Sequence, residues 1–391
     1  MTDSRERAAD GVWAGLVGQD RAVEVLRPAV AGHGMTHAWL FTGPPGSGRS
    51  NLAVAFAAAL QCERGGCGEC HECHTALAGS HADVGVVRTE QLSIGVKEVR
   101  ELVRRSALAP AGRRWQIIIV EDADRLTEQA ANALLKAIEE PNGRTVWMLC
   151  APSAEDVLPT IRSRCRQLTL ATPSVAAVAD HLVRRDGVSA ELASYAARAS
   201  QGHIGRARAL ARDEATRERR RTVVSYPARL TSLGACMRAA TELAAVAKEE
   251  ADAITSELDA REKADLDLQY GVVDRGRRPR EYAPALSALD KAQKTRAKRR
   301  VIDVVDRGLI DLVSVYRDAI ALDLGTGVEL VNEEIRDQIE EIARNSTAEL
   351  NLRRIGWIFE AREQMVEFNV PVALALESMM VALKVPSRNE R

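Results

Sequence analysis

The segment HAWLFTGPPGSGRS, residues 37–50, joins a short apolar run to a glycine-rich loop. From Gly43 to Ser50 it follows the phosphate-loop pattern G-x-x-x-x-G-K-[ST], except that Arg49 stands where the lysine belongs. In this pattern the glycines let backbone N–H groups surround a phosphate, and the helix that follows adds the positive end of its dipole. The segment therefore predicts a buried strand, a nucleotide-type loop and a helix. The predicted nucleotide-binding positions in the loop are Gly43, Gly46, Gly48, Arg49 and Ser50.

Apolar runs and helical patterns alternate after this loop. Residues 116–120 read QIIIV and residues 145–150 read TVWMLC, as buried parallel strands do. Residues 127–140 carry a strong helical pattern that ends at Pro141. Strands that alternate with helices indicate an α/β domain with a parallel sheet flanked by helices.

The pattern changes after about residue 168, because the following segments read as helices without a convincing strand. We therefore predict an α/β nucleotide-type domain over residues 1–168, a small helical lid over 169–213 and a C-terminal all-α domain over 214–391. Within the last of these, residues from about 257 to 300 form a heavily charged insertion. Its composition suits either a mobile loop or an extended solvated helix.

The charge balance limits the classes of function. The chain has 54 Lys plus Arg against 55 Asp plus Glu, a net charge of −1, so it is not coated with phosphate-seeking charge. Any nucleic-acid contact should be local or supplied by partners. No stretch reaches the roughly 18–20 consecutive apolar residues of a membrane helix, and the N-terminus MTDSRERAAD lacks an apolar signal core. We therefore expect a cytoplasmic protein without a membrane segment.

Four of the seven cysteines fall within one short segment, with the spacing C-x₄-C-x₂-C-x₂-C. Glycines between them give the backbone freedom to wrap around an ion, and four thiolates complete a tetrahedral structural Zn²⁺ site. An iron–sulfur cluster, which also takes four cysteines, is the alternative. His71 and His74 could compete as ligands. The predicted metal ligands are Cys62, Cys67, Cys70 and Cys73.

Two departures from the usual nucleotide site bear on catalysis. Arg49 keeps a positive charge, but its planar guanidinium is larger and less freely placed than a lysine ammonium. After the QIIIV strand come Glu121 and Asp122, the reverse of the Asp–Glu order that holds Mg²⁺ and activates water in ATPases. An acidic pair at a strand end can also serve only to cap or solvate a turn. Binding of ATP with Mg²⁺ therefore stays open, whereas efficient hydrolysis is not expected.

Further strings occur in a consistent order: Val17-Gly18-Gln19 before a helix, NALLKAIEEP at 132–141 and LPTIRSRC at 158–165. Together with the loop and the cysteine insertion, they resemble the clamp-loader branch of the AAA+ proteins, which includes the gamma/tau and delta-prime subunits of bacterial DNA polymerase III. The resemblance is strong over residues 15–170, weaker to about 212 and only architectural beyond. It implies an AAA+ domain, a helical lid and a C-terminal collar domain.

The resemblance also implies roles for particular residues. In this family the arginine of the Ser-Arg-Cys string, here Arg164, reaches across a subunit interface to the γ-phosphate of a neighbour's ATP as an arginine finger. The first sensor position of the family falls near Ala151 or Pro152, neither of which has a polar side chain. The second sensor, an arginine in the lid, is displaced, because Gly205 occupies its place and Arg206 is one step away.

These departures occur together, so the resemblance implies a non-catalytic subunit of the delta-prime type, which supplies its finger in trans while the sliding clamp is loaded onto DNA in replication. The implied partners are gamma/tau and delta subunits in a hetero-pentameric ring, with the sliding clamp and primer–template DNA reached through the assembly. The alternative within the family is an active gamma/tau-type ATPase. A third interpretation, a zinc-ribbon nucleic-acid binder, is opposed by the near-neutral charge balance and the scarce aromatics.

Amphipathic stripes in the C-terminal region predict helices that fill the domain's own core or pack against homologous domains in the ring. The stripes include Leu309, Leu312 and Val313, then Ile355, Ile358 and Phe359.

Overall fold

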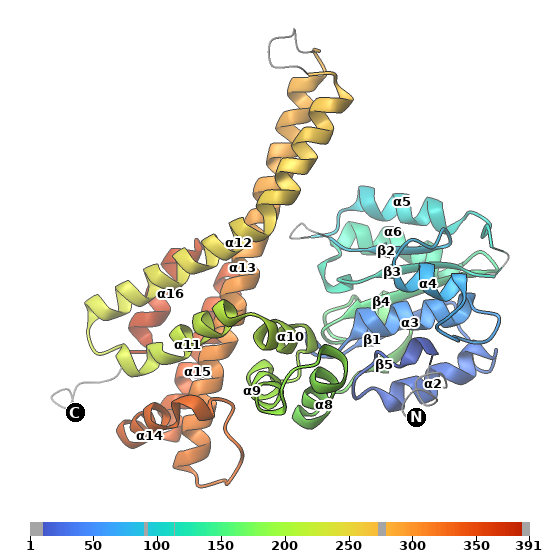
Figure 1. The fold of residues 1–391 in the computed structure, drawn as a ribbon. Helices are drawn as coiled ribbons and strands as arrows, with labels where there is room; N and C mark the ends of the chain where they lie inside the picture. Colours follow the sequence, from blue (N-terminus) through green and yellow to red (C-terminus); the bar gives the residue numbers. More distant parts are fainter. Residues whose placement is uncertain (1–10, 90–92, 113, 273–278, 385–391) are drawn as a thin grey trace. The chain divides into compact units, whose positions relative to one another are not determined.

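A computed structural model defines residues 11–89, 93–112, 114–272 and 279–384 of the protein (Figure 1). The chain divides into two compact units, one up to Arg212 and one from Asp213 onward. The first unit contains three hydrophobic clusters and the second contains a large one of its own.

The first unit is built around a five-stranded sheet in which neighbouring strands are parallel, in the order β2-β3-β4-β1-β5. The three inner strands are buried along their whole length and mostly apolar, because helices cover both faces of the sheet. The edge strand β5 is mostly exposed and polar. The strands are β1 (Ala38–Thr42), β2 (Val84–Val87), β3 (Gln116–Val120), β4 (Thr145–Ala151) and β5 (Arg166–Thr169). The predicted α/β class with a parallel sheet is confirmed.

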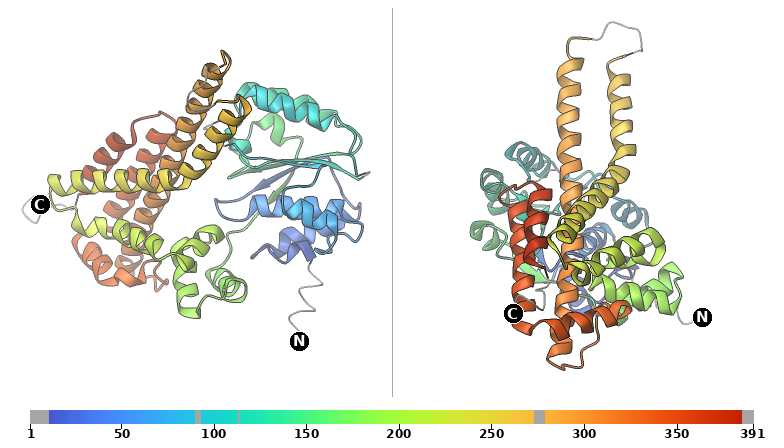
Figure 2. Two further views of the ribbon diagram at one scale, coloured as in Figure 1. Left: turned by 45° about the horizontal axis from the view of Figure 1, so that its top comes forward. Right: turned by 90° about the vertical axis from the view of Figure 1, so that its left-hand side faces the viewer.

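Alternate residues of each inner strand enter opposite layers of core. Trp39 and Phe41 lie in one layer, whereas Leu40 and Trp147 lie in the other. Figure 2 shows the helices on either side of the sheet. The first layer contains η1 (Gly11–Trp13), α2 (Asp20–Val30), α3 (Arg49–Gln61) and α4 (His71–Leu77). The second contains α5 (Val96–Ser106), η2 (Ala123–Arg125), α6 (Glu128–Glu139) and α7 (Pro159–Arg162).

Three short helices complete the first unit. They are α8 (Val175–Asp186), α9 (Ala190–Ser200) and α10 (Ile204–Arg212). Ser174 and Ser189 cap the first two by accepting hydrogen bonds from backbone N–H groups in the first turn. Their shared core is made chiefly of alanines and is joined by Val17 from the N-terminal segment.

The second unit contains helices and no strand among its described residues. Most of the predicted apolar stripes fill its own core: Leu309, Leu312 and Ile358 are buried, whereas Phe359 is 44% exposed. Val313 and Ile355 are partly buried against the same core. The elements are α11 (Glu214–Arg229), α12 (Leu233–Gln269), α13 (Tyr282–Asp323), η3 (Glu333–Ile335), α14 (Arg336–Asn345), α15 (Ala348–Val366) and α16 (Val372–Ala382).

The charged segment 257–300 is helical over nearly all of its described residues, because α12 continues to Gln269 and α13 begins at Tyr282. The extended-helix alternative therefore applies to these parts. Residues 273–278, which carry most of the basic string RGRRPR in the predicted insertion, lie outside the described residues. None of the described helices is long and apolar enough to cross a membrane.

Candidate functional site

The phosphate loop joins β1 to α3 in a strand–loop–helix arrangement. Gly46 and Gly48 adopt left-handed backbone angles, with φ of 84° and 92°, where a side chain would be strained. A Cβ on Gly46 would also overlap the side chain of His203. Position 46 therefore needs glycine for a second reason, because His203, which lies just before α10, packs directly against the loop.

Arg49 is the first residue of α3, and its guanidinium turns back to donate a hydrogen bond to the carbonyl of Gly43. Partial burial lowers the pKa of Arg49, and the nearby carboxylates of Asp124 and Asp122 oppose that shift. The cation therefore lies near the carboxylates that follow β3. These carboxylates of the same chain favour its charged form.

Glu121 and Asp122 directly follow β3, at the edge where the carboxyl ends of the parallel strands meet. Glu121 forms an ion pair with Arg88, with 2.8 Å between Nε and Oε2. Its other carboxylate oxygen is buried and finds no hydrogen-bond partner among the described residues. Burial raises the pKa of the nearby Asp124, and the carboxylate of Asp122 adds to the shift. At least one of the two predicted acidic residues is thus engaged by a cation of this chain.

Two residues that sequence reasoning did not assign to the site organise the loop. Gln19 is buried and donates to the carbonyls of Ser47 at 3.1 Å and Ala171 at 2.8 Å, so it ties the loop to the segment that precedes α8. His203 lies just before α10 and covers Gly46. Gln19 belongs to the Val17-Gly18-Gln19 string of the family resemblance, so the sequence does single it out. The histidine carries no such signal, because its contact is with a residue far away along the chain.

The two predicted sensor positions are also defined. Ala151 is buried at the end of β4, and the carbonyl of Pro152 accepts a hydrogen bond from the backbone N–H of Gly43. In α10, Gly205 is exposed, and the backbone N–H of Arg206 donates to Nδ1 of His203 at 3.2 Å.

Arg164 lies in the turn between α7 and β5, and its side chain is 39% exposed. Its Nη2 pairs with Glu139 at 2.6 Å, and its Nη1 donates to the carbonyl of Thr160 at 2.8 Å. Glu139 ends α6, so the ion pair joins the NALLKAIEEP and LPTIRSRC strings. Arg162 points elsewhere, toward the carbonyl of Ala154 at 3.4 Å.

The four cysteines converge beside α4. Their sulfur atoms all lie within 4.8 Å of one another, with Cys62 3.6 Å from Cys67 and 3.7 Å from Cys70. A tetrahedral ion with metal–sulfur bonds of about 2.3 Å requires sulfur–sulfur separations of about 3.8 Å. Although burial disfavours the thiolate, surrounding backbone N–H groups, led by that of Cys67, lower the pKa of Cys62 to about 6. The cluster, which includes Cys73, therefore fits a metal ion.

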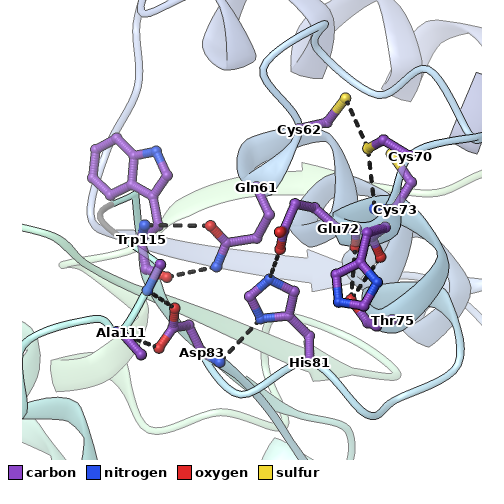
Figure 3. A network of polar contacts seen from close by, with 12 residues as sticks. Gln61, Cys62, Cys70, Glu72, Cys73, Thr75, His81, Asp83, Ala111 and Trp115 are labelled. Atoms are coloured by element: carbon purple, nitrogen blue, oxygen red, sulfur yellow. Dashed lines mark hydrogen bonds and ion pairs between the residues drawn. The ribbon is translucent and has the colours of Figure 1, made fainter.

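Hydrogen bonds connect this cluster to the sheet (Figure 3). Glu72, which lies between two of the cysteines, pairs with His81 at 2.6 Å, and the other ring nitrogen of His81 accepts from the Asp83 N–H at 3.0 Å. The carboxylate of Asp83 in turn accepts from the N–H groups of Ala111 and Gly112. The cysteine segment is thereby anchored to the start of β2 and to the loop before β3.

Comparison with known proteins points to one family. A family model described as DNA polymerase III, delta subunit, matches residues 18–174. A delta-prime subunit of DNA polymerase III from Pseudomonas aeruginosa is 41% identical over 155 residues, which are 38% of this chain and 47% of that protein. A delta-prime subunit from Bacillus subtilis is 30% identical over 209 residues, or 53% of this chain and 63% of that protein.

A gamma/tau subunit from Mycobacterium tuberculosis is 30% identical over 313 residues, or 76% of this chain and 51% of that protein. The chain thus spans about half the length of the first curated relatives it matches. Among solved structures, a gamma-subunit-related protein from Thermotoga maritima matches 93% of this chain and 98% of its own, with 15% identity and a TM-score of 0.41.

The parallel sheet and the altered phosphate loop lie within residues 18–174, and this part of the chain matches the clamp-loader subunits of DNA polymerase III. Within that family, the delta-subunit model and the delta-prime relatives support a delta-prime subunit.

Proposed function

We propose that this protein is a non-catalytic delta-prime subunit of the clamp loader, and that it supplies Arg164 in trans to the ATP site of a neighbouring subunit while the sliding clamp is loaded onto DNA. The observation that carries the proposal is a contrast within one unit. Arg49 and His203 cover the chain's own phosphate loop, whereas Arg164 is half-exposed. An active gamma/tau-type ATPase, the alternative, would need an open loop with its cation available.

The chain's own loop is poorly equipped for catalysis. Phosphoryl transfer from ATP needs a cation on the β- and γ-phosphates, an acid that holds Mg²⁺ and a group that positions the attacking water. Here Arg49 is hydrogen-bonded to the carbonyl of Gly43, and Glu121 is paired with Arg88. ATP with Mg²⁺ would have to displace the guanidinium and move His203 away from Gly46. We therefore expect no ATPase activity from the chain alone.

The environment of Arg164 suits a finger. Its partner Glu139 is 44% exposed, and such surface pairs contribute only about 0–1 kcal/mol. The guanidinium can therefore exchange this carboxylate for a phosphate at little cost. A γ-phosphate that gains negative charge in the transition state is the stronger partner, because a guanidinium offers it two parallel hydrogen bonds.

We propose Zn²⁺ as the ion of the four-cysteine cluster. Four thiolates in tetrahedral spacing are typical of structural zinc sites, whose role is to hold the surrounding backbone together. Cys62 ends the α3 segment, and Cys70 and Cys73 belong to the start of α4. These residues would join the two helices through the glycine-rich turn between them.

The proposed partners are gamma/tau and delta subunits in a hetero-pentameric ring in the cytoplasm, with the sliding clamp and primer–template DNA reached through the assembly. The support is that the relatives are named as subunits of DNA polymerase III. In such a ring, residues 1–168 would be the AAA+ domain, 169–213 the lid and 214–391 the collar.

Arg164→Ala in a complex reconstituted with gamma/tau and delta tests the finger. The variant should fold and assemble normally, because the side chain is half-exposed and outside the core. Hydrolysis at the one site that it serves should fall by about 10³- to 10⁵-fold. The loss measured for the whole complex should be much smaller, because the other sites have fingers of their own.

Arg162→Ala is the matched control, since it removes a neighbouring arginine from the same turn, and its effect should be milder. ATP hydrolysis and clamp loading at wild-type rates by the Arg164→Ala complex would show that the subunit is only a scaffold. Steady hydrolysis by the isolated wild-type chain would instead favour the gamma/tau-type ATPase.

A further inference from the structure

α12 and α13 form a two-helix arm in the second unit. Residues 251–269 of α12 run beside residues 282–302 of α13, and the pair extends beyond the other helices of this unit (Figures 1 and 2). We call these two segments the arm. Its buried residues are Ala251, Thr255, Tyr282, Arg296 and Ile302. A hydrophobic core therefore contributes little to holding the two helices together.

Charged and polar side chains take the place of a core. Arg296, whose side chain is 7% exposed, lies 2.5 Å from Asp259 and donates to Glu262 at 3.0 Å. Gln293, one turn earlier on α13, donates to the backbone carbonyl of Asp259 at 3.0 Å and to the Glu262 carboxylate at 3.2 Å. Asp259 and Glu262 are thus bound by residues on the side of α13 that faces α12. Their carboxylates therefore do not neutralise the cations on the side of α13 that faces away from α12.

The two helices of the arm carry opposite charge. Residues 251–269 contain six carboxylates and two cations, whereas residues 282–300 contain six cations and a single carboxylate, that of Asp290. The side chains of Arg296 and Arg299 are only 7% and 13% exposed, so the exposed positive charge of residues 282–300 is chiefly that of the three lysines. The arm therefore presents an acidic helix on one side and a basic helix on the other.

Lys291, Lys294 and Lys298 form a lysine face on α13. They are spaced by three and four positions, so they lie on consecutive turns of one side of the helix, and all three are exposed. Lys298 donates to the amide oxygen of Asn369, and the described residues provide no carboxylate partner to any of the three. At a rise of about 1.5 Å per residue the face is about 10 Å long. This length matches about three phosphates of one DNA strand, which repeat every ~3.4 Å along the helix axis.

We infer that the lysine face of the arm binds the phosphate backbone of double-stranded DNA without reading its sequence. Protein interfaces are depleted in lysine and depend on large apolar anchors, but no large apolar residue lies between these lysines in the sequence. A duplex needs no apolar anchor, since a line of mobile cations is sufficient to displace its counterions. The acidic α12 would repel a duplex from the opposite side of the arm.

The inference rests on the proposed function only for the source of the duplex, which would be primer–template DNA in the clamp-loader assembly. The contact itself belongs to this chain. It can be measured without any partner subunit.

The test is a titration of the full-length chain with a fluorescein-labelled duplex at several salt concentrations. Lys291→Gln/Lys294→Gln/Lys298→Gln should weaken binding at low salt by about tenfold or more, because three cations leave one face. The slope of log K against log salt should fall by about 2–3, since each lost phosphate contact removes about 0.9.

The matched control is Arg238→Gln/Lys248→Gln/Arg261→Gln, which removes three exposed cations from α12. It should bind the duplex within about twofold of the wild type, because these residues are off the lysine face. All six side chains are exposed, so both variants should unfold at the wild-type temperature.

Wild-type binding by the lysine variant, or no duplex binding by the wild-type chain, would overturn the inference. An equal loss in the α12 variant would also overturn it, because only net charge would then matter. If the lysine variant binds the duplex normally but no longer assembles with gamma/tau and delta, the face contacts a protein and the inference fails. If the wild-type chain does not assemble, yet the lysine variant alone loses duplex binding, the proposed function fails and this inference stands.

Discussion

At the scale of single residues, Arg49 is the position at which the phosphate loop departs from the usual pattern. Its guanidinium donates to the carbonyl of Gly43 and is attracted by Asp122 and Asp124. Lysine, the residue of the ordinary pattern, is a compact ammonium on a flexible stem and lacks the planar fork. It would reach outward to a phosphate more readily than a guanidinium that is held over the loop.

Arg49→Lys should therefore bind ATP more tightly than the wild type, by about tenfold if one charge-assisted contact is restored. Hydrolysis should remain negligible, because Glu121 is still paired with Arg88 and the acidic order is still reversed. Equilibrium binding of a fluorescent ATP analogue and release of phosphate measure the two properties. Adding Ser50→Ala to this variant is the control, and it should remove any Mg²⁺-dependent part of the gain. Steady turnover by Arg49→Lys would contradict this account.

At the scale of elements, the cysteine segment depends on both its sulfur cluster and its anchor to the sheet. The cluster joins the end of α3 to α4, and the Glu72–His81–Asp83 chain of hydrogen bonds continues to the start of β2. Loss of the ion should therefore loosen residues 62–83 first. The inner strands are held by their own apolar core and should be affected less.

We predict one Zn²⁺ per chain by elemental analysis, with Zn–S distances of about 2.3 Å by X-ray absorption. Cys70→Ser should lower the zinc content and increase hydrogen exchange in α4. His71→Ala and His74→Ala are the controls, and both should retain the ion because four cysteines already complete a tetrahedron. Iron with visible absorbance, or a protein without metal, would contradict the zinc assignment.

The elements differ in how well the sequence predicts them. β1, β3 and β4 are mostly apolar runs of five to seven residues, because helices cover both of their faces, and each is visible in the sequence alone. β2 and β5 have four residues each and lie at the edges of the sheet, and the sequence pattern does not indicate them. They become strands only because a buried neighbour offers hydrogen-bonding partners on one side.

At the scale of the whole molecule, the second unit has an apolar surface that its own core does not cover. Leu352, Phe359 and Val366 recur every seven residues along α15 and are 64%, 44% and 60% exposed. Seven-residue spacing places them on one side of the helix. We propose that this exposed stripe packs against the proposed partner subunits.

Leu352→Glu/Phe359→Glu should therefore prevent stable assembly with gamma/tau and delta while leaving the isolated chain folded. Size-exclusion chromatography with light scattering measures assembly, and circular dichroism measures folding. Leu268→Glu is the control, because Leu268 is 82% exposed on the arm and away from this stripe. A wild-type chain that stays monomeric beside both partners would contradict the ring. Normal assembly of the double variant would place the interface elsewhere.

The sequence by itself determines the altered phosphate loop, the four-cysteine spacing and the three inner strands, because each is a local pattern of neighbouring residues. It also determines that one segment of the arm is acidic and the other basic, but not which of these charges pair across the two helices. Only the tertiary structure decides that His203 covers Gly46, that Arg164 pairs with Glu139 and that Arg296 takes up carboxylates of α12. Each of these contacts joins residues that are distant along the chain. Their side chains meet only after helices and strands have packed, so no local pattern records them.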